Sequence, residues 1–189
     1  GGEAITSYCL LDSDYWTDED IAERYAQATR SGVQLHIWRH KEIENYLLVP
    51  AAIARYITGR APSGSEVPDA DTIQAKLVEL ANARWDETFD ATLANVLARD
   101  RGLGGGGASQ RTRELLTCRC PDLPSRLAVV SGKRLISDLS GWSQEAYSVA
   151  ISPVALARTL GQTEIAREVA QVLSSITHGR AVAPWQSRY

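Results

Sequence analysis

The first sixty residues alternate short apolar runs with one helical stripe. Ile5–Leu11 is an apolar run that predicts a strand, and Val33–Trp38 alternates apolar and polar side chains as a second strand would. Between them, Thr17 and Asp20 have the spacing of a capping box, and apolar residues at helical spacing lead up to Gly32. A strand, a helix and a second strand with short connections form a βαβ unit, so this part predicts a parallel sheet.

From residue 50 onward the pattern is mostly that of helices. Pro50 suits the first turn of a helix that runs to Gly59, and residues 71–101 have the apolar spacing of one long helix or two shorter ones. Gly102–Gly107 predicts a flexible break, and the prolines at 121 and 124 predict irregular structure. Further helical segments are predicted at Ser109–Cys118, Leu135–Leu139, Val154–Leu160 and Ile165–Ile176.

These patterns divide the chain into three parts. Residues 1–60 form an α/β part, residues 61–126 form a helical insertion with the Gly-rich break, and residues 127–189 hold a short apolar run and the last helices. The predicted fold class is α/β, a small parallel sheet with a mostly helical carboxyl-terminal lobe.

Two aspartates follow the first predicted strand directly. Asp12 and Asp14 are one residue apart, at the end of a strand where α/β folds place their sites. Two carboxylates this close repel each other unless a cation lies between them, so the pair predicts a site for a hard divalent ion such as Mg²⁺. The alternative is a solvated turn, in which Asp and Ser are common.

Two glutamates follow the second predicted strand. If this segment is extended, Glu42 and Glu44 point to the same side, because side chains alternate along a strand. A parallel sheet would then bring them next to Asp12 and Asp14, and several carboxylates in one crevice are hard to explain without cations. A solvated charged turn is the alternative, and it is weaker for Glu44 because apolar residues on both sides hold that segment against the core.

Composition narrows the function classes. The net charge is −3, so there is no overall basic field for nucleic acid, and contact with phosphate would be local, through Arg39, His40 and Lys41. An apolar share of 44% supports a core, and no apolar run approaches the roughly 20 residues that span a bilayer.

The cysteines and the missing methionines indicate the setting of the chain. Cys9, Cys118 and Cys120 give no even disulfide framework, and the last two lack the second pair that a zinc site needs, so we expect free thiols in a reducing, cytoplasmic environment. The start of the chain lacks the features of a signal peptide. Because methionine is absent throughout, we expect this chain to be a piece of a longer protein.

With these segments placed, the chain resembles the carboxyl-terminal Toprim-type nuclease region of the OLD (overcoming lysogenization defect) family, which follows an ABC-type ATPase. The matching stretches are Leu10–Tyr15, His36–Leu48, Val130–Lys133 and the closing run of helices, in the order of the family. The aspartate pair alone is a weak signal, whereas the run Glu42–Leu48 after it is much more specific.

The resemblance implies a role for each matching residue. Asp12 and Asp14 would match the metal-binding aspartates of the family. Glu44 would match the acidic ligand before the Asn-Tyr pair, and Glu42 an oxygen ligand two residues earlier. Lys133 would match the lysine thought to stabilise the transition state, although an ordinary lysine at a helix start is the alternative. Leu127–Val130 would be a remaining strand of the Toprim sheet.

The implied activity is metal-dependent cleavage of DNA phosphodiester bonds, with two Mg²⁺ or Mn²⁺ ions. The implied partners are DNA and an amino-terminal ATPase domain; no membrane is expected, and assembly of identical chains stays open. One feature departs from the family: Toprim domains carry a glutamate on an earlier strand-to-helix turn, and only Glu3 precedes Asp12. That glutamate is expected outside this chain, which by itself could be inactive.

Two other function classes fit the residues. A haloacid-dehalogenase-type phosphotransferase or phosphatase also places an aspartate pair at a strand end and uses the first as nucleophile, although the bulky Tyr15 and Trp16 are unusual after such a pair. A non-catalytic interaction module on the same fold would leave the carboxylates as solvated turns.

Overall fold

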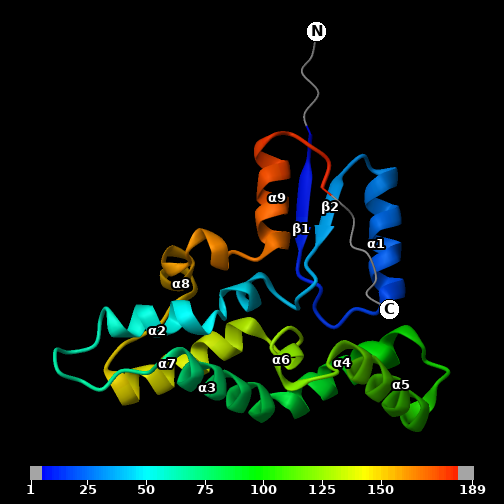
Figure 1. Ribbon diagram of the computed structural model, residues 1–189. Coiled ribbons are helices and arrows are strands. Elements are labelled where there is room, and N and C mark those ends of the chain that lie inside the picture. The colour runs from blue at the N-terminus through cyan, green and yellow to red at the C-terminus, as the bar shows by residue number, and fades with distance from the viewer. Residues whose placement is uncertain (1–5, 183–189) are drawn as a thin grey trace.

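The computed structural model describes residues 6–182, the side chains of residues 123 and 124 excepted. Within this range a small α/β layer stands on a larger helical part (Figure 1). The first elements are β1 (Tyr8–Leu11), α1 (Asp18–Arg30), β2 (Gln34–Ile37), the 3₁₀ helix η1 (Ile43–Leu47) and α2 (Pro50–Thr58). They are followed by α3 (Ala70–Ala83), α4 (Trp85–Arg99), α5 (Gly104–Arg119), α6 (Leu123–Arg126), α7 (Gly132–Tyr147), α8 (Pro153–Thr159), η2 (Gln162–Glu164) and α9 (Arg167–Thr177).

The two strands form the predicted βαβ unit. β1 and β2 pair in parallel, with Tyr8 opposite Gln34 and Leu11 opposite Ile37. Both strands are shorter than predicted, and Ile5 lies outside the described residues. The capping box that begins α1 is confirmed, because the Thr17 hydroxyl accepts from the Asp20 amide while the Asp20 carboxylate accepts from the Thr17 amide at 2.8 Å. The prediction of an α/β fold that is mostly helical is confirmed.

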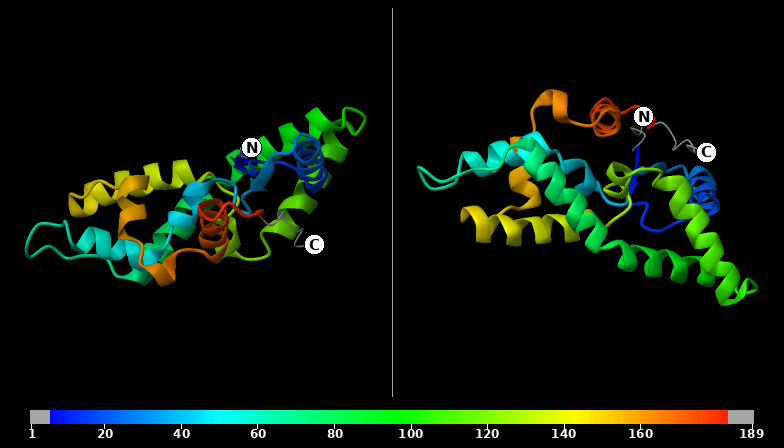
Figure 2. Two further views of the ribbon diagram at one scale, coloured as in Figure 1. Left: turned by 90° about the horizontal axis from the view of Figure 1, so that it is seen from above. Right: turned by 60° about the horizontal axis from the view of Figure 1, so that its bottom comes forward.

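Helices α1 and α9 cover opposite faces of the sheet (Figures 1 and 2). Leu35 and Ile37 pack with Ile21 of α1, whereas Trp38 packs with Val172 of α9. The alternation follows from the period of two along a strand. Both faces of the sheet are thus covered, and the carboxyl ends of the strands point toward the helical part (Figure 1).

The main core lies in the helical part. It is built mostly from apolar side chains of α2, α3, α7 and α8, whose fully buried members are Ile53, Ile57, Ile73, Leu77, Leu135, Leu139 and Leu156. This core joins residues from all three predicted parts of the chain. Residues 71–101 form two helices, α3 and α4, as one of the two predictions had it. No helix in residues 6–182 combines the length and the apolar character that crossing a bilayer requires.

The prediction of a flexible break at Gly102–Gly107 is wrong for residues 104–107, because α5 begins at Gly104 and continues to Arg119, whereas Gly102 and Leu103 lie between α4 and α5. A glycine costs about 1 kcal/mol in a helix relative to alanine, so propensity alone favours a break. Burial outweighs this cost: Ala108, Thr112 and Leu116 are buried at helical spacing on the side of α5 that packs on α4. Helix α6 likewise contradicts the irregular structure predicted around residue 124, since proline is tolerated in a first turn.

The strand implied at Leu127–Val130 is absent from the described residues, where this stretch is a turn. Its carbonyl groups accept hydrogen bonds from residues that follow β2. The Asn45 side-chain amide donates to the carbonyls of Leu127 at 2.6 Å and Val130 at 2.8 Å, and the Lys41 amide donates to the Ala128 carbonyl at 2.7 Å. The stretch therefore lies against the segment after β2 without extending the sheet. The three cysteines are free thiols, as predicted.

Candidate functional site

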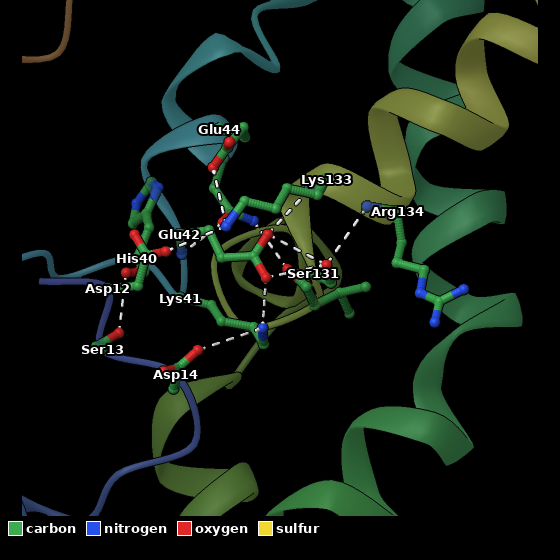
Figure 3. A network of polar contacts seen from close by, with 12 residues as sticks. Asp12, Ser13, Asp14, His40, Lys41, Glu42, Glu44, Ser131, Lys133 and Arg134 are labelled. Atoms are coloured by element: carbon green, nitrogen blue, oxygen red, sulfur yellow. Dashed lines mark hydrogen bonds and ion pairs between the residues drawn. The ribbon is translucent and has the colours of Figure 1, made fainter.

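Three segments meet where the two strands end (Figure 3). The first is the turn after β1, with Asp12 and Asp14. The second is the connection from β2 into η1, with Lys41, Glu42 and Glu44. The third is the start of α7, where Lys133 is the second helical residue. The ends of the strands and the start of α7 therefore bring all five sequence-predicted site residues together.

Lys133 lies between two of the carboxylates. Its Nζ is 3.3 Å from Asp12 Oδ2 and 3.9 Å from Glu44 Oε2, and Figure 3 shows the ammonium pointing between them. The other Asp12 oxygen accepts from the Ile43 amide at 3.2 Å, which ties the two strand ends together. Burial alone would lower the pKa of Lys133, but the hydrogen bond to Asp12 and the charge of Glu44 outweigh it and raise the pKa above its ordinary value. Lys133 is therefore protonated, and its charge faces both carboxylates.

Lys41 lies between the other two carboxylates. It is buried, with its Nζ 2.6 Å from Glu42 Oε1 and 3.8 Å from Asp14 Oδ1. Burial raises the pKa of Asp14; Lys41 opposes this shift, while the charges of Asp12 and Glu42 add to it. Lys41 also lies over the ring of Tyr15, 4.6 Å from its centroid. We predicted a local contact with phosphate through Arg39, His40 and Lys41, but Lys41 is buried and already paired with Glu42 and Asp14.

Glu42 fastens the start of α7 to the strand end. Its carboxylate accepts from the Ser131 hydroxyl at 3.0 and 3.1 Å and from the Lys133 amide at 2.9 Å, in addition to Lys41. Burial would raise the pKa of Glu42, but these hydrogen bonds together lower it. In the described structure both oxygens of Glu42 are thus already engaged by protein donors.

The prediction that Glu42 and Glu44 share one side of an extended segment is wrong. Glu42 is extended, but Ile43–Leu47 is a 3₁₀ helix, and the Glu42 amide donates to Asn45 Oδ1 at 2.9 Å. This local hydrogen bond starts the helical turn. Glu42 then contacts the Ser131 hydroxyl and the Lys133 amide at the start of α7, whereas Glu44 faces the Lys133 ammonium.

Comparison with protein-family models, curated proteins and solved structures gives no match. The resemblance to the OLD family therefore stays a prediction. What the site can do has to be inferred from its own geometry.

The donor set suits a hard cation in its chemistry, although it is not assembled around one. Among residues 6–182, no group of three or more His, Cys, Asp or Glu side chains is arranged to hold a metal ion, and lysine ammoniums stand between the carboxylates. One oxygen of Glu44, Oε2, is buried and accepts no hydrogen bond, although the Lys133 ammonium lies 3.9 Å away. A buried carboxylate oxygen with no hydrogen bond has unused capacity for a cation that takes the place of the ammonium. Asp12, Asp14 and Glu44 are the residues that could hold one.

Three residues that shape the site were given no role by the sequence. Asn45 joins η1 to the turn before α7, Ser131 binds Glu42, and Gly132 lies so close to η1 that an added Cβ would come within 2.7 Å of the Asn45 amide nitrogen. The only sequence signal was that Asn45, Ser131 and Gly132 fall inside the matching stretches. Their roles depend on contacts between distant segments, which spacing does not reveal.

Proposed function

We propose that this chain is the acidic part of a divalent-metal-dependent DNA endonuclease of Toprim type, coupled in its parent protein to an ATPase domain. The observation that carries the proposal is the meeting of Asp12, Asp14, Glu44 and Lys133, from three separate segments, at the carboxyl ends of parallel strands. Ligands bind at this end of the sheet in α/β folds. The family resemblance of the same segments adds to this argument.

The chemistry of phosphodiester hydrolysis suits these side chains. Two bound Mg²⁺ or Mn²⁺ ions would supply an activated water and stabilise the leaving oxygen. Asp12, Asp14 and Glu44 would hold the ions, since carboxylate oxygens are their preferred ligands. Lys133 would face the phosphate and neutralise the charge that develops on it. Glu42 would act through α7, by holding Lys133 in place.

Titration calorimetry with Mn²⁺ tests the metal site on the whole chain. We expect wild type to bind Mn²⁺, Asp12→Asn to lose most of the heat, and Asp90→Asn, which neutralises an exposed aspartate on α4, to behave as wild type. Identical isotherms for wild type and Asp12→Asn would remove the basis of the proposal. They would instead favour a non-catalytic interaction module.

A second candidate is a phosphotransferase or phosphatase with Asp12 as nucleophile. The pairing of Lys133 with Asp12 favours it, because a lysine beside a nucleophilic carboxylate can also neutralise a phosphoryl group. Beryllium fluoride separates the two candidates: an adduct on Asp12 supports the phosphotransferase, and plasmid cleavage without an adduct supports the nuclease.

A further inference from the structure

A cavity of about 800 Å³ lies between α9 and the end of β2, outside the acidic site. Its polar lining comes from His36 and Arg39 on the strand side and from Arg167, Gln171, Ser174 and Ser175 on α9. The sequence had singled out Arg39 as a local phosphate contact, and no step proposed above uses it or Arg167.

The acidic residue of this cavity, Glu168, is held in place by several hydrogen-bond donors. Glu168 accepts from His36 Nε2 at 3.1 Å, from the Arg39 amide at 3.1 Å and from the Tyr46 hydroxyl. Burial would raise the pKa of Glu168, but the hydrogen bonds from His36 and Tyr46 outweigh it and lower the pKa. The carboxylate therefore stays ionised, with its oxygens turned to these donors, and contributes one negative charge against the two positive charges of Arg39 and Arg167.

The remaining charges of the lining are positive. Arg39 and Arg167 are both exposed, and they approach the cavity from different elements. Gln171, Ser174 and Ser175 add amide and hydroxyl groups, which are common partners of phosphate and sugar oxygens. Guanidinium groups with such neighbours form a cavity suited to a phosphodiester chain.

The chain segment that lines the cavity at Arg39 continues directly into the acidic site. Arg39 is the second residue after β2, and the segment that it begins carries Lys41, Glu42 and Glu44. The same Glu168 that binds the Arg39 amide also binds Tyr46 of η1, next to the site. The cavity and the acidic site therefore share the segment that follows β2.

We propose that this cavity binds the sugar–phosphate backbone of the DNA strand that enters the acidic site, with Arg39 and Arg167 as its charged contacts. The proposal rests on the proposed function for the direction of the strand. Binding itself needs neither the metal nor cleavage, so it can be tested separately.

The test is fluorescence anisotropy of a labelled single-stranded oligodeoxynucleotide of about twelve residues, within the range of single-strand site sizes, in EDTA with the whole chain. We compare wild type with Arg39→Gln, Arg167→Gln and a matched control, Arg158→Gln, which removes an exposed arginine of α8. Each cavity substitution is expected to weaken binding about three- to fivefold, as the loss of an exposed ion pair does. Each should also reduce the slope of log affinity against log salt concentration by about 0.7.

The proposal is overturned if wild type does not bind, or if the cavity variants match Arg158→Gln in affinity and salt slope. It is also overturned if poly-glutamate displaces the oligonucleotide as well as unlabelled DNA does, because the cavity would then respond to charge alone. Thermal melts of each variant check the fold. If binding depends on both arginines but Mn²⁺ gives no cleavage, the cavity stands and the nuclease proposal fails.

Discussion

At the scale of single residues, the site is organised by two lysines, each of which lies between two of the four carboxylates. Lys133 holds Asp12 and Glu44, while Lys41 holds Asp14 and Glu42. The two lysines differ in exposure, since Lys41 is 6% exposed and Lys133 is accessible at 57% of its side chain. An exposed ammonium can yield its place to a metal ion, whereas a buried one is part of the framework.

Replacing Lys133 should therefore have opposite effects on metal binding and on catalysis. In Lys133→Met the competing ammonium is gone, so we expect Mn²⁺ affinity to rise roughly tenfold, in keeping with one screened charge at close range. DNA cleavage should fall, because the phosphate loses its cation. Calorimetry and a plasmid assay measure the two effects, with Lys76→Met on α3 as the control. Weaker Mn²⁺ binding in Lys133→Met would contradict this competition.

Glu42 should make stability depend on pH. Folding lowers the pKa of Glu42 below its ordinary value of 4.5, so its stabilising effect is present above that value and is lost as the pH falls through the folded pKa. Glu42→Gln leaves Lys41 buried without its main partner and should cost about 3 kcal/mol at neutral pH, as broken buried pairs do. Urea unfolding at several pH values should show that the variant loses less stability than wild type on acidification. Parallel curves would show that Glu42 is not responsible.

At the scale of elements, α7 is placed by its first turn. Ser131 and the Lys133 amide bind Glu42, and Gly132 packs directly on η1. The sequence predicted a helix with Leu135, Ile136 and Leu139 on its buried face, and this is confirmed. The sequence did not predict the contact of the first turn with η1, because Gly132 follows Asn45 by 87 positions and no local period links the two residues.

Two glycines of α7 give a matched test of this contact. An alanine Cβ at position 132 would come within 2.7 Å of the Asn45 amide nitrogen and 2.9 Å of its side chain, whereas at position 141 nothing lies within 4 Å. We expect Gly132→Ala to lower the free energy of unfolding by about 2 kcal/mol, because backbone has to shift. Gly141→Ala should raise it by about 0.5 to 1 kcal/mol through helix propensity.

Denaturant unfolding of both variants measures the difference. Gly132→Ala should also weaken cleavage, since Lys133 moves with the helix start, while Gly141→Ala should cleave as wild type does. Equal stabilities in the two variants would show that α7 has room to move away from η1.

At the scale of the whole molecule, periodicity predicted most of the elements and missed what depends on distant partners. The βαβ unit, the capping box at Thr17 and the helices α2, α7 and α8 follow from local patterns, and so did the convergence of the acidic residues on one edge. The helix through the glycine run was missed because its stability comes from packing on α4. The pairing of each lysine with two carboxylates was missed, because the alternation of side chains along a strand indicates which way they point and not which charges pair.

The sheet has only two strands among the described residues, and this bears on how further residues could join the acidic site. Within residues 6–182 β1 pairs with β2 alone, so its other side has no strand partner. A parallel neighbour there, whichever polypeptide supplied it, would end next to Asp12, where a carboxylate at its end could join the acidic residues. Under the proposed function, sheet extension is a route by which a further carboxylate could reach the ions.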